Sequence, residues 1–184
     1  MNILAISGSL RTASINSAFC RAASRLAPAP LRVSVFAGLG ILPLFNPDLE
    51  TDPPHAVREF RMAVANARAL VIASPEYAHG VSGVLKNGLD WLVSFEGFIH
   101  KPVVLVNTSP RAHHAYDALR EILQTMSANI LSEASITLPL LGACTTEDAM
   151  MSSLEIAPRI RGILLSLARA LKANSGAGAN FPLD

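Results

Sequence analysis

The chain has 184 residues, of which 51% are hydrophobic and 16% are charged, and its formal net charge is +1. This length predicts one domain over residues 1–184, because single domains usually contain roughly 100–200 residues. The small net charge and the lack of a basic run argue against a nucleic-acid partner. The charged fraction is low against about 25% in typical proteins, which suggests that other subunits cover part of the surface.

The two cysteines, Cys20 and Cys144, match no zinc or redox motif, and Cys20 is expected to be a small core residue. No histidine pair has the spacing of metal ligands, so no metal site is expected. No basic segment or cleavage site precedes the first apolar run, so we expect no secretory signal. No apolar run approaches the ~20 residues needed to span a bilayer, and we therefore expect a cytoplasmic protein with no membrane span.

Apolar patterning predicts strands that alternate with helices along the chain. Strands are expected at residues 3–7, 31–36, 69–74, 102–108 and, last, near 132–138. Apolar residues at helical spacing predict helices over 15–26, 54–67, 82–93, 113–128 and 158–173. The long connection over 37–53 is too apolar to be free of the protein body and is expected to pack against it. This alternation is typical of an α/β fold with a doubly wound five-stranded parallel sheet and helices on both faces.

In such sheets, ligands bind beyond the carboxyl ends of the strands, at the point where the strand order reverses. Three loops follow predicted strands and are polar or aromatic where an ordinary turn need not be. They span residues 8–15, 75–81 and 109–114. We therefore expect a binding site where these loops meet.

The first of these loops reads ISGSLRTASIN over residues 6–16 and joins a strand to a helix. Unpaired N–H groups at a helix N-terminus favour anions, and hydroxyl groups and Arg11 add further donors. The sequence therefore allows a phosphate site here. It equally allows an ordinary turn in which Ser14 or Asn16 caps the helix and Arg11 is solvated. The glycine patterns of dinucleotide-binding Rossmann sites and of P-loops do not occur in this loop.

Two segments together resemble the NADPH-dependent FMN reductase family: GSLRTASIN over residues 8–16 and PEYAHGVSGVLKNGLDWL over residues 75–92. Members of this family include quinone, azo-dye and chromate reductases. The resemblance extends over nearly the whole domain and is strong in these two segments, which follow the first and third predicted strands. It implies a flavodoxin-like fold, bound FMN, and NADPH or NADH as the co-substrate.

The resemblance also implies which residues bind the cofactor. The first segment would hold the FMN phosphate through Ser9, Arg11, Ser14, Ile15 and Asn16. The second segment would lie along the isoalloxazine ring and contribute Pro75, Glu76, Tyr77, Ala78, His79 and Gly80. A dianionic phosphate needs a charged, donor-rich turn, whereas a flat ring needs an aromatic and backbone wall, with glycine where the backbone comes close.

Two positions depart from the family pattern. Many relatives carry asparagine where this chain has Ala78, which removes one polar contact near the ring. The loop after the fourth strand reads SPRAHH over residues 109–114 where relatives often have a glycine pair. Ser109 remains a candidate ring neighbour. Arg111 and the two histidines, His113 and His114, either meet phosphates of the nicotinamide nucleotide or the substrate, or form a solvated basic loop.

The resemblance implies an FMN-dependent NAD(P)H oxidoreductase with ping-pong kinetics. The hydride would pass from reduced nicotinamide to FMN and then to a small-molecule electron acceptor such as a quinone, an azo compound, chromate or free flavin. No catalytic side chain is assigned, because the cofactor carries out the chemistry. Two alternatives are a flavodoxin-type electron carrier, which would be strongly acidic, and a degenerate family member that lacks flavin. A phosphorelay receiver is excluded, because the first and third predicted strands do not end in the acidic residues it needs.

Finally, the resemblance implies that the flavin lies at a subunit interface. The helix from Ser82 to Val93 would then join a homodimer or homotetramer. Leu85, Leu89 and Trp91 fall on this helix and either supply the contact or belong to the core.

Overall fold

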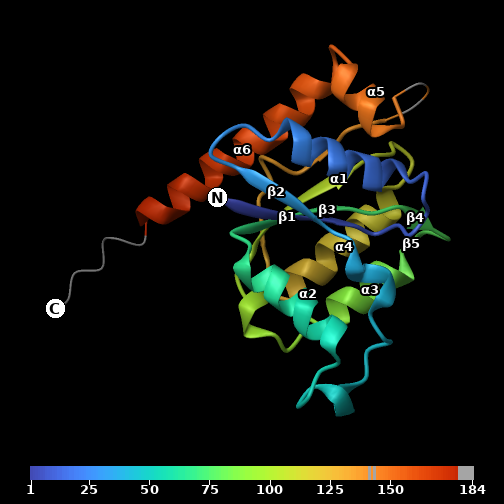
Figure 1. The fold of residues 1–184 in the computed structure, drawn as a ribbon, viewed down its shortest axis with the longest axis vertical. Helices are drawn as coiled ribbons and strands as arrows, with labels where there is room; N and C mark the ends of the chain where they lie inside the picture. Colours follow the sequence, from blue (N-terminus) through green and yellow to red (C-terminus); the bar gives the residue numbers. More distant parts are fainter. Residues whose placement is uncertain (141, 143, 178–184) are drawn as a thin grey trace.

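A parallel sheet lies at the centre of the protein, and helices cover both of its faces (Figure 1). The computed structural model describes residues 1–140, 142 and 144–177. The strand order is β2-β1-β3-β6-β7, and β8 also pairs with β6. The bounds of these strands are β1 Asn2–Ser7, β2 Arg32–Phe36, β3 Ala69–Ala73, β6 Pro102–Asn107, β7 Asn129–Ile130 and β8 Ile136–Thr137. The order confirms the doubly wound α/β architecture.

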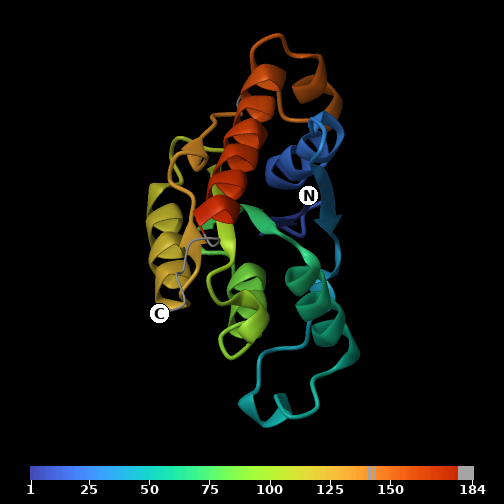
Figure 2. The ribbon, with the colours of Figure 1, turned by 90° about the vertical axis from the view of Figure 1, so that its left-hand side faces the viewer.

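The connections between the strands are mainly helical. The α-helices are α1 Ile15–Leu26, α2 His55–Asn66, α3 Gly83–Asp90, α4 His113–Thr125, α5 Glu147–Ser152 and α6 Ile156–Ala177. Short 3₁₀ helices η1 Gly38–Ile41, η2 Pro47–Leu49 and η3 Glu96–Phe98 and a hairpin of β4 Glu76–Tyr77 and β5 Gly80–Val81 complete the fold. Helices α1 and α6 cover one face of the sheet, and α2, α3 and α4 cover the other (Figures 1 and 2).

Both faces of the sheet are buried, which explains why its central strands are continuously apolar. Along β1, Ile3 and Ala5 point toward α1 and α6, whereas Leu4 and Ile6 point toward the opposite helices. Cys20 lies in the first of these cores, and its burial raises the pKa of its thiol to about 12. It is therefore an inert packing residue, as the sequence predicts. Among the described residues, no helix combines the length and the apolar character needed to cross a membrane.

The predicted last strand over residues 132–138 is wrong except at its end. The fifth position in the sheet is shared by β7 and β8, which pair with opposite ends of β6 and are separated by a turn. The Ser135 hydroxyl compensates for the interruption. It accepts a hydrogen bond from the Leu105 N–H (3.0 Å) and donates one to the Leu131 carbonyl (2.9 Å). A side chain thus replaces one missing backbone partner, a substitution that hydrophobic periodicity does not reveal.

The helix predicted over residues 82–93 is shorter than expected and ends at Asp90. The Trp91 side chain is fully buried, and its indole N–H donates to the Pro43 carbonyl (2.8 Å). This bond fastens the 37–53 connection to the protein body, as predicted. Leu85 and Leu89 are also buried within the chain. The interpretation of these three residues as subunit contacts is therefore wrong, because their side chains are already enclosed by the chain's own core.

Candidate cofactor-binding site

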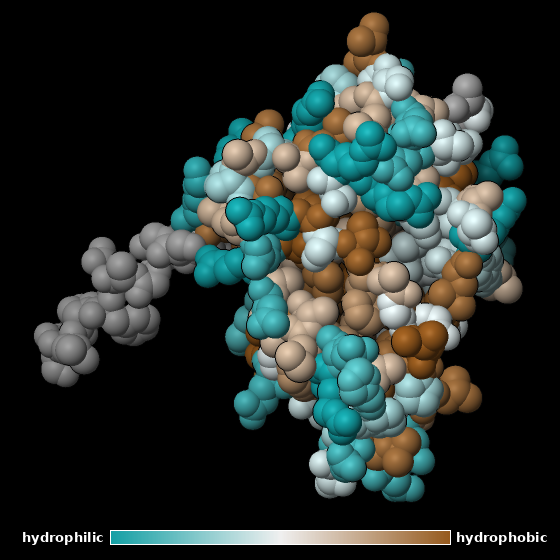
Figure 3. Space-filling model, in the orientation of Figure 1, coloured by the Kyte–Doolittle hydropathy of each residue, from teal (hydrophilic) through white to brown (hydrophobic). Residues whose placement is uncertain are grey.

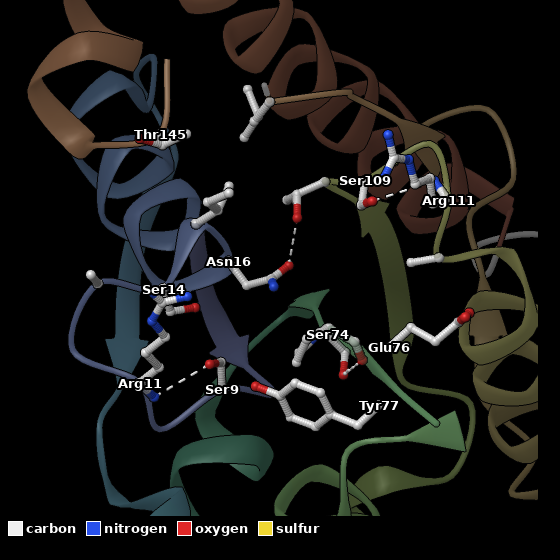
Figure 4. A pocket seen from close by; sticks show the side chains of 16 residues that line it. Ser9, Arg11, Ser14, Asn16, Ser74, Glu76, Tyr77, Ser109, Arg111 and Thr145 are labelled. Carbon is white, nitrogen blue, oxygen red and sulfur yellow. Dashed lines mark hydrogen bonds between the residues drawn. The ribbon is translucent and has the colours of Figure 1, made fainter. Parts of the chain in front are cut away.

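A cavity of about 600 Å³ opens where β1, β3 and β6 end (Figure 4). The chain leaves β1 toward α1 on one face and leaves β3 toward α3 on the other. The loops therefore diverge at the point where the strand order reverses, as expected for a ligand crevice. The predicted site residues in its walls are Ser9, Arg11, Ser14, Ile15, Asn16, Pro75, Glu76, Tyr77 and Ser109. The structure does not bring Ala78, His79 or Gly80 into these walls.

The first loop is held tightly against β3. The Gly8 N–H donates to the Ala73 carbonyl (2.8 Å), and a Cβ atom at Gly8 would overlap the Ser74 hydroxyl. Ser14 caps α1, since its hydroxyl accepts from the Ser17 N–H (3.2 Å). The capping interpretation of Ser14 is therefore correct. It does not exclude an anion site, because a single cap satisfies only one of the free N–H groups of the first helical turn.

The same turn carries hydrogen-bond donors that have no acceptor among the described residues. They are the backbone N–H groups of Ile15 and Asn16 and the guanidinium of Arg11, which forms no ion pair within the described part of the chain. The Ser9 hydroxyl accepts from the Arg11 backbone N–H (3.3 Å) and thereby orders the loop. The first loop thus presents a fixed positive charge and free N–H groups at the edge of the cavity.

Asn16 links this loop to the end of β6. The Thr108 hydroxyl donates to the Asn16 side-chain carbonyl (2.8 Å), and both residues are buried. This bond leaves the Asn16 amide N–H groups without an acceptor among the described residues. Sequence reasoning missed Thr108, because the two partners lie far apart in the sequence and only the sheet order brings them together.

The hairpin of β4 and β5 supplies an aromatic wall. The Tyr77 side chain is 56% exposed and lies across the cavity mouth toward Ser9 (Figure 4). The turn of the hairpin is formed by Ala78 (φ 49°) and His79 (φ 60°). Both residues adopt the left-handed conformation that a two-residue type I′ turn requires and that asparagine tolerates better than alanine. The structure therefore gives a backbone reason to expect asparagine to be favoured over alanine at position 78, apart from any ring contact.

Glu76 connects the hairpin to α4 and points away from the cavity centre (Figure 4). One of its carboxylate oxygens accepts from the Ala115 N–H (2.8 Å), and the other pairs with the His79 imidazole (3.1 Å). Helix α4 has no side-chain cap of its own at Ala112, so Glu76 caps it from another element. The Ala115 N–H above all, with His79 and the nearby His114, lowers the pKa of this carboxyl. Glu76 thus positions the hairpin that carries Tyr77.

Several residues in the cavity wall are not among the cofactor-binding residues predicted from the sequence, although Arg111 is a candidate for contact with the nucleotide or the substrate. These additional lining residues are Ala13, Ser74, Thr108, Arg111, Ala112, Leu140 and Thr145. Thr145 lies two residues before α5 begins at Glu147. Ion pairs from Arg21 and Arg25 to Glu147 fasten α5 to α1. Those ion pairs depend on the tertiary path of the chain, so the sequence pattern alone does not place this segment at the cavity.

Fold and site together define a flavodoxin-like α/β protein whose first loop presents anion-binding groups beside an aromatic wall. The sequence model for the NADPH-dependent FMN reductase family matches residues 1–140. The chain belongs to this family, and the resemblance that its two motifs show is confirmed.

Known proteins similar to the chain include an NAD(P)H-dependent FMN reductase from Pseudomonas aeruginosa, which is 35% identical over 129 residues. The matched region covers 68% of this chain and 69% of that protein. A 2-hydroxy-1,4-benzoquinone reductase from a Burkholderia species is 40% identical over 91 residues. That match includes 50% of this chain and 49% of the relative, so the chain spans about half the length of the Burkholderia protein.

A solved structure shares the fold. It is FerB, a flavoenzyme NAD(P)H:(acceptor) oxidoreductase from Paracoccus denitrificans, with a TM-score of 0.82 and 23% sequence identity. The superposition covers 94% of this chain and 97% of FerB. The flavodoxin-like fold is therefore confirmed over nearly the whole chain.

Replacing Ala78 with asparagine should stabilise the protein, because asparagine adopts a positive φ at lower cost. We expect the free energy of unfolding to rise by up to about 1 kcal/mol, measured by urea denaturation. Ala78→Val is the matched opposite change and should lower it, since a branched side chain is strained at this φ. Equal stability of all three proteins would contradict the role given to the turn.

The lowered pKa of Glu76 predicts a pH-dependent contribution to stability. A carboxyl whose pKa is lower in the folded state stabilises the fold above its ordinary pKa, and this contribution is lost as the pH falls through the lowered value. Glu76→Gln should therefore be less stable than wild type at about pH 7 and should lose less stability between about pH 7 and pH 3. Urea unfolding at both pH values measures this, and parallel losses in the two proteins would argue against the cap.

Proposed function

We propose that the chain is an FMN-dependent NAD(P)H oxidoreductase that reduces a small-molecule acceptor of the quinone class. The observation that carries this proposal is the set of free donors in the first loop, which face the same cavity as the Tyr77 ring. A phosphate needs free hydrogen-bond donors, and a planar ring system needs an aromatic wall. Family membership supports the same cofactor.

The first loop fits the FMN phosphate. Arg11 supplies a permanent charge with forked donors, and the N–H groups of Ile15 and Asn16 supply neutral donors at the start of α1. The Ser9 and Ser14 hydroxyls line the same part of the cavity. These groups match the charge and acceptor oxygens of a dianionic phosphate.

The second and third loops fit the isoalloxazine ring. Pro75, Glu76 and Tyr77 would form one wall, and Ser109 would lie on the side of β6. Ala78, His79 and Gly80 would act through the turn that places Tyr77. When bound, FMN would accept a hydride from reduced nicotinamide and pass reducing equivalents to the acceptor. The chain would bind and orient the reactants, and no side chain is proposed to act as an acid or nucleophile.

The names of the relatives support a quinone as the acceptor. The Burkholderia relative is a reductase of 2-hydroxy-1,4-benzoquinone, and further relatives from Pseudomonas putida and Escherichia coli are named quinone reductases. Azo compounds, chromate and free flavin are the acceptors against which benzoquinone should be compared. A net charge of +1 argues against a flavodoxin-type carrier, which would be strongly acidic.

We further propose that residues 1–184 act as one domain in the cytoplasm. The cavity draws its walls from loops between residues 9 and 145, which supports one cooperative unit. Cys20 and Cys144 are both free thiols, which suits a reducing compartment.

We also propose a homodimer or homotetramer, formed by residues beside α3 rather than by its buried side. Leu10, Ile41 and Leu44 are exposed, and Leu10 packs against Gly40. Figure 3 shows hydrophobic residues scattered among hydrophilic ones toward the lower end of the molecule, near this connection. Leu10 follows Ser9 directly, so the apolar surface borders the proposed flavin site and a second copy of the chain could cover both.

The cofactor proposal is tested with purified protein. Wild type should absorb in the flavin bands and oxidise NADPH or NADH steadily when benzoquinone is added. Arg11→Ala should fold normally but bind FMN roughly tenfold to a hundredfold more weakly, because a charged hydrogen bond is worth about 1.5–3 kcal/mol. Fluorescence titration of FMN measures the affinity, with Arg120→Ala, an exposed arginine on α4, as the matched control. Unchanged FMN affinity in Arg11→Ala would remove Arg11 from the phosphate site.

The oligomer proposal is tested by light scattering on a sizing column. Wild type should elute as a dimer or tetramer of the 19.5 kDa chain, and the Ile41→Glu/Leu44→Glu variant should elute as a monomer. Charged groups in an apolar contact would be buried without partners, which is costly. Leu154→Glu, at a fully exposed position beyond α5, serves as the control. A monomeric wild type would refute the proposal.

A further inference from the structure

Basic side chains gather at the margin of the cavity on the side of β6. The rings of His79 and His114 lie edge to face with centroids 4.4 Å apart, and those of His113 and His114 lie 4.1 Å apart. Arg111, two residues before His113, lines the cavity itself. His79 lies in the hairpin after β3, and the other three residues lie in or just after the loop that follows β6. These two segments are far apart in the sequence but adjacent in the fold.

Arg111, the permanently charged member of this cluster, has no acidic partner among the described residues. Glu76 is the only carboxylate that contacts the cluster within the described part of the chain, and both of its oxygens already accept hydrogen bonds. The Arg111 guanidinium forms no ion pair with any described residue. A permanent charge with free forked donors, beside imidazole rings that can donate hydrogen bonds, favours an anionic ligand.

A metal ion does not explain the cluster. Across residues 1–140, 142 and 144–177, no group of three or more histidine, cysteine, aspartate or glutamate side chains is arranged to hold one. The imidazoles contact each other through their rings, and the Nδ1 atom of His79 is engaged with Glu76.

Arg11 and Arg111 lie on opposite sides of the cavity (Figure 4). If the FMN phosphate binds at Arg11, Arg111 is left for a second anion beyond the far edge of the ring. A quinone carries no charge that would need it, whereas a nicotinamide dinucleotide carries a pyrophosphate and, in NADPH, a further phosphate on the ribose. The margin of the cavity is also open to solvent, since the His79 side chain is 76% exposed. This openness suits a long ligand that extends from the cavity onto the surface.

We propose that Arg111, together with His79, His113 and His114, forms a second anion-binding site that holds a phosphate of the nicotinamide dinucleotide. The inference rests on the proposed function. It assigns the loop over residues 109–114 to recognition of the hydride donor, and it makes Arg111 a residue that determines affinity for that donor.

The test uses FMN-loaded protein and the oxidised nucleotides NADP⁺ and NAD⁺, which bind without transferring a hydride. Isothermal titration of wild type, Arg111→Ala, His113→Gln/His114→Gln and the control Arg120→Ala gives each dissociation constant. Arg111→Ala should weaken binding roughly tenfold or more while keeping full FMN occupancy, and Arg120→Ala should match wild type. The histidine double variant should show a smaller loss in the same direction.

The two nucleotides distinguish which phosphate is bound. A loss for both in Arg111→Ala assigns the site to the shared pyrophosphate, and a loss for NADP⁺ alone assigns it to the ribose phosphate; either result supports the proposal. Full FMN occupancy with unchanged affinity for both nucleotides in Arg111→Ala overturns it. A wild-type protein that takes up no FMN overturns the proposed function instead, and this inference with it.

Discussion

The close contact between the loop after β1 and the end of β3 determines the rest of the site. The Gly8 N–H reaches the Ala73 carbonyl, and the Ser74 hydroxyl occupies the space that a side chain at Gly8 would need. From this contact the chain diverges, toward α1 on one face and toward the hairpin and α3 on the other. The crevice between the two paths is therefore a product of strand order, and its polar lining is a product of the residues that follow each strand.

Electrostatics divide this crevice into two sides. On the side of α1, the donors of the first loop have no acceptor within the described residues. On the side of α4, Glu76 already supplies a negative charge to the helix N-terminus and to His79. An external anion at α1 therefore meets free N–H groups together with Arg11, whereas beside α4 it meets the carboxylate of Glu76 at the helix N-terminus, with Arg111 nearby in the cavity wall. The two ends of one cavity are in this way suited to different anionic groups.

The sequence predicted two kinds of structure correctly: central strands, whose residues are buried on both faces of the sheet, and helix starts, which depend on residues close together in the chain. The central strands were found because Ile3, Val71 and Val104 lie in continuous apolar runs, and the start of α1 because Ser14 precedes a helical pattern. The contacts that sequence reasoning missed join distant residues, as Thr108 joins Asn16 and Ala115 joins Glu76. Hydrophobic periodicity also does not reveal that the Ser135 hydroxyl takes the place of a backbone hydrogen-bond partner. Nor does it reveal the ion pairs that fasten α5 to α1.

The division of the fifth sheet position between β7 and β8 affects how readily the protein should aggregate at high concentration. Open sheet edges can recruit strands from other molecules and start aggregation, and long, regular edges do so most readily. Here β7 and β8 contain two residues each, and the turn between them breaks the row of backbone groups on that flank. Ser135 compensates for the interruption within the sheet. The same interruption leaves no long, regular edge with which a strand of another molecule could pair.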